Sequence, residues 1–381
     1  MKIIAAPNAF KGSLSATEAA NAMKKGILAA IPDCDVICVP VADGGDGLTE
    51  VMSFALSGKL IEVSVMDPVF EPLSSVFCLA ENKGVAVIEM ARASGLAILP
   101  KEKQDPTKTS TYGTGELILA ALDRGVERIV VGLGGSATCD GGIGMASALG
   151  YKFLDKNGTE LIPIGDSLHM IHSIDKSKVD TRLRNVVFEG VCDVTNPLTG
   201  PNGASYVYSF QKGATAEQVK DLDEGLKNLA AVIQREIGID IREMTGAGAA
   251  GGLGGGLHAF LGAKLRKGID LVIDIVNLKE KIRGADLVLT AEGQMDFQTK
   301  YDKAPAGVAR AAKEAGIPCI AICGGVGERI EELYDIGIDA VFTLCNGPQT
   351  LETAMQDSFY LLSRAVEQVV RTFLAGRSGG C

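Results

Sequence analysis

The sequence predicts an α/β fold: a Rossmann-like or flavodoxin-like parallel-sheet domain built from both chain ends, with an inserted second α+β domain. Near both ends, short Val- and Ile-rich runs alternate with segments of helical period, which is the pattern of βαβ units. In between, residues 61–105 alternate with a period of two and contain turn signals, which is typical of antiparallel or mixed strands. A chain of 381 residues is long enough for two domains.

The N-terminal part begins with a clear strand, loop and helix. KIIAAP (2–7) is predicted as a strand, and a capping box formed by Ser15 and Glu18 predicts the start of a helix. VICVPVA (36–42) is predicted as the next strand, and a helix is expected from about Leu48.

The C-terminal third repeats this alternation and ends in a long helix. Its predicted strands are 285–293, 318–325 and 340–347, and its predicted intervening helices are 305–316 and 328–337. We therefore expect one discontinuous domain formed by residues 1–64 and 285–381, and a second domain formed by residues 65–284. A cleft between the two domains is the expected ligand site.

The overall composition favours a small-molecule partner. A net charge of −10 argues against nucleic acid or an acidic membrane surface, because no broad basic field is present. Apolar runs are too short for a signal peptide or a membrane span. The nine cysteines lie scattered in strand-like runs, which predicts free thiols in a cytoplasmic protein, and with three histidines and no CxxC pair they do not indicate a zinc site.

The two common nucleotide-binding motifs are absent from the sequence. No GxxxxGK[ST] loop occurs, and no GxGxxG turn follows a strand with an acidic residue about twenty positions later. Instead, several glycine-rich turns follow predicted strands. In an open α/β sheet, ligands bind at this carboxyl end of the strands.

The stretch GLGGSATCDGG is the main candidate for an anion-binding loop. It follows a strand that ends near Val131 and precedes a short predicted helix, so N–H groups of residues 134–137 are expected to face an anion at a helix N-terminus. The alternative is a tight turn that packs a helix against a strand. Ser136, Thr138 and Asp140 favour the binding role.

Carboxylates follow two further predicted strands. Glu292 and Asp296 come just after one strand, where such groups hold Mg²⁺ together with water and substrate phosphate, although helix capping alone would explain Asp296. Asp193 follows another apolar run and precedes Asn-Pro. We interpret Asp193 as a base or a hydroxyl-orienting group, with an Asx-turn as the alternative.

Other candidate positions are less specific. Lys11 is either a clamp for phosphate or carboxylate or a solvated lysine, and Asp43 and Asp46 could reach the same cleft. TSTYGTGELI (109–118) holds more hydroxyls than helix capping explains. TGAGAAGGLGGGL (245–257) fits a second anion loop and close helix packing equally well.

Seven motifs together resemble those of the bacterial glycerate kinase family (type I), in the same order and over nearly the full chain. They are APNAFKGSLSATEAA, PVADGGDG, TSTYGTGELI, GLGGSATCDGGIGM, CDVTNPLTGPNGA, GAGAAGGLGGGL, and AEGQMDFQT followed by KAPAGVA. The resemblance implies a kinase that uses ATP and Mg²⁺ to phosphorylate D-glycerate to 2-phosphoglycerate, or to 3-phosphoglycerate as some descriptions of the family have it. A homodimer is left open.

With this resemblance, the site residues are expected to divide by role. The expected nucleotide- or phosphate-binding residues are Gly134, Gly135, Ser136, Ala137 and Thr138. The expected substrate-binding residues are Ser13, Asp43, Asp46, Thr111 and Asn196. The expected catalytic residues are Asp193, Asp296 and Lys11, and the expected metal ligands are Glu292 and Asp296.

The sequence departs from the family pattern in three places. Asn8 and Ala9 replace the Asp-Ser of APDSFKGS, Asp302 stands in the segment that reads GKAP in the family, and Cys139 replaces an Asn. A base at the position of Asn8 would be lost, so we expect Asp193 or Asp296 to act as the base.

Two other functions compete with this hypothesis. GLGGSAT is also similar to the GLGSSA loop of the homoserine and mevalonate kinase superfamily, but the βαβ pattern at both chain ends does not suit that fold. A two-lobed sensor that binds a hydroxy acid without turnover is the other alternative. The pair Glu292 and Asp296 argues against it, because a binder needs no metal-binding carboxylates.

Overall fold

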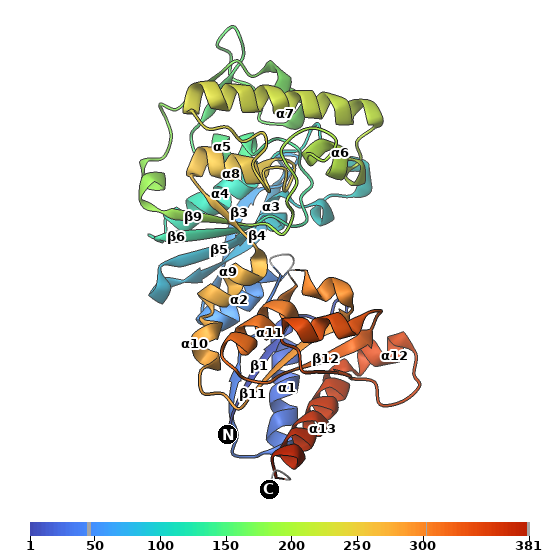
Figure 1. Ribbon diagram of the computed structural model, residues 1–381. Helices are drawn as coiled ribbons and strands as arrows, with labels where there is room; N and C mark the ends of the chain where they lie inside the picture. Colours follow the sequence, from blue (N-terminus) through green and yellow to red (C-terminus); the bar gives the residue numbers. More distant parts are fainter. Residues whose placement is uncertain (44–46, 302, 379–381) are drawn as a thin grey trace. The chain divides into compact units, whose positions relative to one another are not determined.

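The computed structural model describes residues 1–43, 47–301 and 303–378. Its contacts divide the chain into two compact units. The first unit comprises Met1–Asp43, Glu50–Leu56 and Gly268–Cys381, and the second comprises Gly44–Thr49 and Ser57–Lys267. Figure 1 labels the elements of both units.

The first unit contains a parallel sheet of five strands in the order β13-β12-β11-β1-β2. Its strands are β1 (Lys2–Pro7), β2 (Asp35–Cys38), β11 (Leu287–Met295), β12 (Cys319–Val326) and β13 (Ala340–Thr343). Numbered within the unit and taken from the β2 edge, the order is 2-1-3-4-5, which is the flavodoxin-like order. Ile3 pairs with Leu287 in parallel register, so the two chain ends do form one sheet, as predicted.

Helices cover this sheet on both faces. They are α1 (Ala16–Ala30), most of α2 (Leu48–Leu56), α9 (Gly268–Ile275), α10 (Leu278–Ile282), α11 (Ala304–Glu314), α12 (Leu351–Gln356) and α13 (Ser358–Ser378), with 3₁₀ turns η7 (Phe297–Lys300) and η8 (Ile330–Ile336). The predicted capping box of Ser15 and Glu18 begins α1. Helices α1 and α13 lie side by side at the lower end of Figure 1. They approach closely at Gly26, where an added Cβ would lie 2.2 Å from the carbonyl oxygen of Ser363.

Two predicted elements of the first unit differ in detail. Residues 328–337 were expected to be an α-helix, but the structure forms the 3₁₀ turn η8 there. The strand predicted at 36–42 is assigned only to Cys38, although Val39 and Val41 still donate backbone hydrogen bonds to strand β1. Pro7 of β1 lacks the N–H that would donate to the carbonyl of Val39, so the regular pairing ends at Cys38.

The second unit contains a mixed sheet of six strands in the order β10-β9-β6-β5-β4-β3. Its strands are β3 (Lys59–Met66), β4 (Pro72–Ala80), β5 (Val85–Glu89), β6 (Arg128–Gly132), β9 (Val187–Val191) and β10 (Lys264–Arg266), and β7 (Lys152–Leu154) pairs separately with β8 (Ser173–Asp175). Strands β3, β4 and β5 are antiparallel neighbours, whereas β5, β6, β9 and β10 run parallel. The period-two stretch therefore forms the antiparallel part, as predicted.

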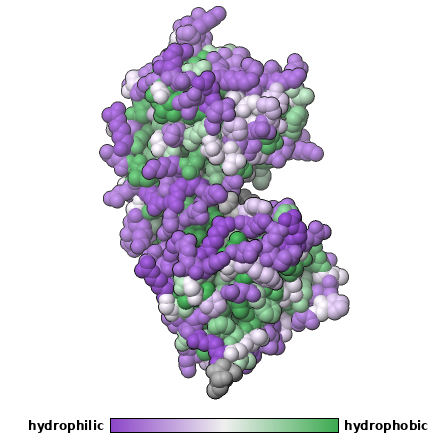
Figure 2. All heavy atoms as spheres, viewed as in Figure 1, coloured by the Kyte–Doolittle hydropathy of each residue, from purple (hydrophilic) through white to green (hydrophobic). Residues whose placement is uncertain are grey.

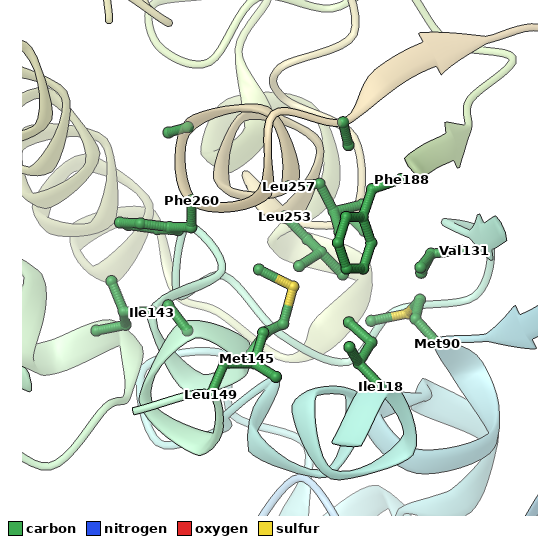
Figure 3. Close-up of a cluster of buried hydrophobic side chains, with 14 of the residues drawn as sticks. Met90, Ile118, Val131, Ile143, Met145, Leu149, Phe188, Leu253, Leu257 and Phe260 are labelled. Atoms are coloured by element: carbon green, nitrogen blue, oxygen red, sulfur yellow. The ribbon is translucent and has the colours of Figure 1, made fainter. Parts of the chain in front are cut away.

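The core of the second unit lies between this sheet and its helices. The helices are α3 (Ala91–Ser94), α4 (Tyr112–Leu122), α5 (Ile143–Ala148), α6 (Ala204–Tyr208), α7 (Ala216–Ile237) and α8 (Leu253–Leu261). The 3₁₀ turns are η1 (Glu81–Lys83), η2 (Leu96–Ile98), η3 (Lys101–Lys103), η4 (Gly165–Met170), η5 (Thr181–Asn185) and η6 (Phe210–Lys212). Figure 3 shows Met145 of α5 among Leu253 and Leu257 of α8 and Phe188 of β9, all buried. This apolar cluster fixes α5 and α8 against the sheet.

The contact-based units and the predicted domain limits do not coincide. Strand β3 begins before residue 65 yet pairs with β4 of the second unit, and α9 and α10 precede residue 285 yet pack against α11 of the first unit. The contacts do not test which parts of the chain fold independently. The two predicted domains, residues 1–64 with 285–381 and residues 65–284, therefore stay a prediction.

Hydrophilic residues cover much of the face shown in Figure 2, with hydrophobic patches between them. Within the described residues, no helix is both long enough and apolar enough to cross a membrane. The described cysteines are free thiols, as expected, and five of them are buried: Cys34, Cys78, Cys139, Cys319 and Cys323.

Candidate functional site

The second unit has a cavity at the carboxyl ends of β6 and β9. These strands are parallel neighbours, so the segments that follow them leave the sheet at the same edge. Gly134, Gly135 and Ser136 follow β6, Asp193 follows β9, and all four residues line the cavity, whose volume is about 340 Å³. The structure thus brings together two of the motifs that the sequence singled out.

The predicted phosphate loop divides into exposed and buried parts. Gly134 and Gly135 are exposed, and Gly135 has a φ of 73°, a conformation that favours glycine. Ala137 is buried and donates its N–H to the carbonyl of Ser94. Helix α5 begins only at Ile143, so the expected arrangement of these N–H groups at a helix N-terminus is not formed. Gly134, Gly135 and Ser136 therefore line the cavity as part of a loop, and not as the N-terminus of a helix.

Asp140 anchors the end of this loop from inside the protein. Its fully buried carboxylate accepts hydrogen bonds from the N–H and hydroxyl of Thr111 (2.8 and 2.7 Å) and from the N–H groups of Gly142 and Gly144 (both 3.1 Å). Burial raises the pKa of Asp140, although these four hydrogen bonds oppose the shift. Asp140 and Thr111 therefore stabilise the loop from the side of α4.

Two further hydroxyls of TSTYGTGELI, those of Thr109 and Thr114, also have partners inside the second unit. Thr109 donates to the carbonyl of Ala137 (3.0 Å), and Thr114 shares a hydrogen bond with Ser94 (2.8 Å). These side chains are fully buried. A polar group that is buried must be hydrogen-bonded, which explains why this segment holds more hydroxyls than a helix cap needs.

Lys212 is a cavity residue that the sequence did not reveal. It ends the 3₁₀ turn η6, it is 1% exposed, and it lines the same cavity as Ser136. Its ammonium group donates hydrogen bonds to the hydroxyl of Ser136 (2.8 Å) and the carbonyl of Thr138 (2.7 Å). Burial lowers the pKa of Lys212 to about 8. A single lysine in FQKGA gives no sequence signal, because most such lysines are solvated.

Asn196 supports the cavity through a neighbour. Its amide oxygen accepts a hydrogen bond from the hydroxyl of Tyr208 (2.7 Å), and its amide nitrogen donates to the carbonyl of Asn202 (2.8 Å). Tyr208 lines the cavity. Asn196 thus fixes the orientation of a cavity wall in this structure, and its direct contact with substrate stays a prediction.

The second glycine-rich stretch packs tightly against the first. An added Cβ on Gly251 would lie 2.0 Å from the carbonyl oxygen of Thr138, and one on Gly256 would lie 2.5 Å from that of Gly141. Gly141 also donates its N–H to the carbonyl of Gly251. Of the two roles that the sequence left open for residues 245–257, the structure accordingly supports close packing.

The first unit gathers a second set of polar residues where β1 and β11 separate. In this strand order, the chain reverses direction across the sheet between these strands, and ligands bind at such a switch point. Strand β1 ends opposite Ala291, so Asn8 and Glu292 lie just beyond the last paired position. The amide of Asn8 donates to Asp43 (3.1 Å), and Asp43 also accepts the N–H of Ala304 at the start of α11.

Glu292 is the most perturbed carboxylate of this group. It is 9% exposed, and among the described residues its Oε2 atom has no hydrogen-bond partner. Burial, together with the nearby carboxylates of Asp43 and Asp296, raises the pKa of Glu292 to about 7. The Lys303 ammonium, 3.9 Å from Oε1, opposes this shift. Burial also raises the pKa of Asp43.

The other predicted site residues of this unit are partly engaged in internal hydrogen bonds and partly exposed to solvent. Asp296 accepts the N–H of Gln298 (2.8 Å) and caps η7, as in its alternative reading. Ser13 donates to Met355 and Ser358. Lys11 is exposed, and its backbone nitrogen lies beside Gly293. Asp46 and Asp302 lie outside the described residues.

The carboxylate oxygens around Glu292 are of the type that Mg²⁺ prefers as ligands. Mg²⁺ prefers oxygen ligands and usually takes one or two carboxylates together with water and phosphate. A cation would supply the partner that Oε2 lacks and would offset the repulsion among these acidic groups. No group of three or more His, Cys, Asp or Glu side chains that could hold a metal occurs in the described part of the chain, so phosphate or water would have to complete the coordination.

Together, these features indicate the class of enzyme to which the protein belongs. The first sheet has carboxylates at its switch point, and the second has a glycine loop and a buried lysine at its carboxyl edge. Such groups suit an enzyme that transfers phosphoryl groups to small molecules. The model of the Glycerate kinase family matches residues 3–374. The chain belongs to this family.

Individual relatives support the same assignment over nearly the whole chain. Glycerate kinases from Halalkalibacterium halodurans and Bacillus subtilis are each 46% identical and cover 96% and 97% of this chain and 97% of their own lengths. Glycerate 2-kinase from Escherichia coli is 43% identical and covers 99% of each chain. The crystal structure of the protein designated glycerate kinase 2 from Salmonella typhimurium LT2 superimposes with a TM-score of 0.92 at 43% identity, again over 99% of each chain.

Proposed function

We propose that this protein transfers a phosphoryl group from ATP to D-glycerate and forms 2-phosphoglycerate, with Mg²⁺ as cofactor. The observation that carries the proposal is the cavity of the second unit, in a chain of the glycerate kinase family. There the glycine loop at Gly134 to Ser136 faces the same space as Asp193. The choice of the 2-hydroxyl is supported by the relative from Escherichia coli, which is named glycerate 2-kinase.

The chemistry of phosphoryl transfer suits these residues. The transition state needs alignment and neutralisation of charge more than covalent help from the protein. Backbone N–H groups of Gly134 and Gly135 can hold phosphate oxygens, because glycine lets a ligand approach the backbone closely. Asp193 can accept the proton of the attacking hydroxyl or orient it, which contributes roughly 10²–10⁴-fold to the rate of such reactions.

Metal binding is assigned to the first unit. We assign Glu292 and Asp296 as the metal ligands, with Asp43 close enough to raise the pKa of Glu292. Bound Mg²⁺ would supply positive charge that neutralises phosphate oxygens. Asp296 can take this role only with the part of its carboxylate that does not cap η7.

We assign glycerate binding to a set of residues that differ in how far their side chains are already engaged in hydrogen bonds within the protein. Lys11 is exposed and available for a carboxylate, and Ser13 lies two residues further along the same loop. Asp43 can accept hydrogen bonds from glycerate hydroxyls. For Thr111 to bind glycerate, Asp140 would have to release its hydroxyl. The proposed roles of Asp46 and Asn196 complete the set.

One reaction tests the activity directly. Purified protein is incubated with ATP, Mg²⁺ and D-glycerate, ADP release is followed, and the product is identified by phosphorus NMR. A 2-phosphoglycerate signal is expected, and 3-phosphoglycerate would reassign the attacked hydroxyl. Binding of D-glycerate without any phosphorylated product would overturn the kinase proposal and favour the sensor.

Two carboxylate variants then separate the proposed roles. Asp193→Asn is expected to lower kcat by roughly 100-fold or more, because it removes a base. Asp296→Asn keeps a good capping residue, so it should fold normally and raise the Mg²⁺ concentration needed for activity. Asp335→Asn, at an exposed position in η8, is the matched control and should behave as the unsubstituted protein. Normal kinetics in Asp193→Asn would assign the base elsewhere.

Two further expectations stay predictions. A cytoplasmic location is tested by fractionating cells, and a homodimer is tested by measuring the mass of the purified protein in solution.

A further inference from the structure

Lys212 carries a positive charge in a place where no described carboxylate contacts its ammonium group directly, although the buried Asp140 carboxylate attracts it from beyond ion-pair distance. The side chain is 1% exposed, and no carboxylate of the described residues lies within ion-pair distance of its ammonium group. Burying an unpaired charge is costly unless something compensates for it. The two acceptors it contacts, the Ser136 hydroxyl and the Thr138 carbonyl, are neutral.

A purely structural role does not explain a lysine here. A glutamine amide could donate hydrogen bonds to the same two neutral acceptors without bringing a charge into the interior. Because Asp140 lies beyond ion-pair distance, the charge of Lys212 indicates a function that involves a negative partner in direct contact with the ammonium group. An ammonium group has three N–H donors, and Ser136 and Thr138 occupy two of them. One donor is left for a ligand.

The position of Lys212 shows where such a ligand would lie. Lys212 lines the 340 Å³ cavity together with Gly134, Ser136 and Asp193, at the carboxyl edge of β6 and β9. The glycine loop offers backbone N–H groups on one wall, and the lysine offers a cation on another. A cavity of this size suits a small ligand.

We propose that this cavity is an oxyanion-binding site and that Lys212 is its charge partner. The lysine has two tasks there: it holds the loop through Ser136 and Thr138, and it contacts the bound anion. The identity of the anion rests on the proposed function, which offers two sources, the phosphate chain of the nucleotide and the carboxylate of glycerate.

The test compares binding of three probes by calorimetry at one pH: inorganic tripolyphosphate, ADP and D-glycerate. Lys212→Met removes the charge and preserves most of the side-chain length, and Lys212→Arg keeps the charge. Lys220→Met, at an exposed position on α7 of the same unit, is the control. Circular dichroism and thermal unfolding establish that each variant is folded.

We expect Lys212→Met to weaken binding of one class of probe by roughly 10- to 100-fold, which is the usual effect of losing one charged hydrogen bond. Lys212→Arg should restore part of the affinity, and Lys220→Met should change nothing. Weaker binding of tripolyphosphate and ADP alone identifies a phosphate site, and weaker binding of D-glycerate alone identifies a carboxylate site. A folded Lys212→Met variant that binds all three probes normally overturns the proposal.

A second measurement covers the case in which Lys212→Met does not fold. In the unsubstituted protein labelled with ¹⁵N-lysine, the Nζ resonance of Lys212 is assigned through its loss in Lys212→Arg. The probe that occupies the cavity should shift this resonance, and no shift at saturating concentrations of all three probes overturns the proposal. Kinase activity is measured separately: Lys212-dependent anion binding without turnover would refute the proposed function alone, and turnover with Lys212-independent binding would refute this inference alone.

Discussion

Among single residues, Glu292 combines burial, neighbouring negative charge and an unsatisfied oxygen atom. Each of these opposes its ionised form, and the pKa of Glu292 rises to about 7 as a result. The folded protein therefore holds a proton on Glu292 that the unfolded chain, with an ordinary pKa of 4.5, has already lost. Such a residue reduces stability at neutral pH and is retained where a cation or a reaction needs it.

The sign of this effect leads to a stability prediction. Between pH 4.5 and 7 the folded state binds more protons than the unfolded state, so Glu292 makes stability fall as the pH rises through that window. Glu292→Gln removes the penalty and should be more stable than the parent protein at pH 8 by up to roughly 3 kcal/mol, with no difference near pH 4.5. Thermal unfolding in the presence of a chelator measures this.

The same pair of proteins also tests the proposed metal ligand. With Mg²⁺ and ADP added at pH 8, the unfolding temperature of the parent protein should rise more than that of Glu292→Gln, since a carboxylate binds Mg²⁺ better than an amide. An equal rise in both proteins would exclude Glu292 as a ligand.

Asn8 offers a comparison with the family motif APDSFKGS, which has Asp at this position. The amide of Asn8 donates to Asp43 and so reduces repulsion beside Glu292. Asn8→Asp adds a fourth carboxylate to Asp43, Glu292 and Asp296 and removes this donor. We expect a lower unfolding temperature without metal and a larger increase on addition of Mg²⁺, and unchanged values for both would show that Asn8 and Asp are equivalent here.

Individual elements are held by close contacts of glycine-rich segments. Helix α8 begins with Leu253, and the next three residues are glycines, which intrinsically disfavour a helix. Their absent side chains let α8 approach the loop at Gly141 and Gly142. Figure 3 shows Leu253 and Leu257 of the same helix in the buried apolar cluster. Tertiary packing therefore outweighs the helix propensity.

A substitution in α8 tests this packing. In most helices Gly→Ala stabilises by about 1 kcal/mol. Gly256→Ala should instead destabilise the protein, because its Cβ would lie 2.5 Å from the carbonyl oxygen of Gly141. Gly376→Ala in α13, where no atom lies within 4 Å of the added Cβ, is the control and should be neutral or stabilising. Urea unfolding measures both, and equal effects would contradict the packing argument.

The elements also show what the sequence could and could not predict. The parallel sheet built from both chain ends was predicted from their βαβ patterns, and the capping box at Ser15 marked a helix start correctly. Hydroxyls at Thr109 and Thr114 suggested a site but are buried in internal hydrogen bonds, because sequence does not show which polar side chains face solvent. Lys212 was missed for the converse reason: its burial comes from tertiary packing alone.

At the scale of the whole molecule, the second unit is nearly continuous in sequence, from Ser57 to Lys267, and has its own sheet and core. The first unit lacks this independence, because β1 needs β11 as a neighbour. A fragment of residues 57–267 should therefore fold cooperatively on its own, and circular dichroism with a single unfolding transition would demonstrate it. The fragment 1–56 should remain unfolded. A disordered 57–267 fragment would show that its stability depends on the rest of the chain.

The parallel pairing of β1 with β11 joins residues that are separated by more than two thirds of the sequence. On the ribosome, β1 emerges first, yet its partner is synthesised only after all of the second unit. For that period the apolar strand has one exposed edge that can pair with other chains. Chaperone occupancy of nascent chains should therefore begin early and end only when residues beyond β11 have been released.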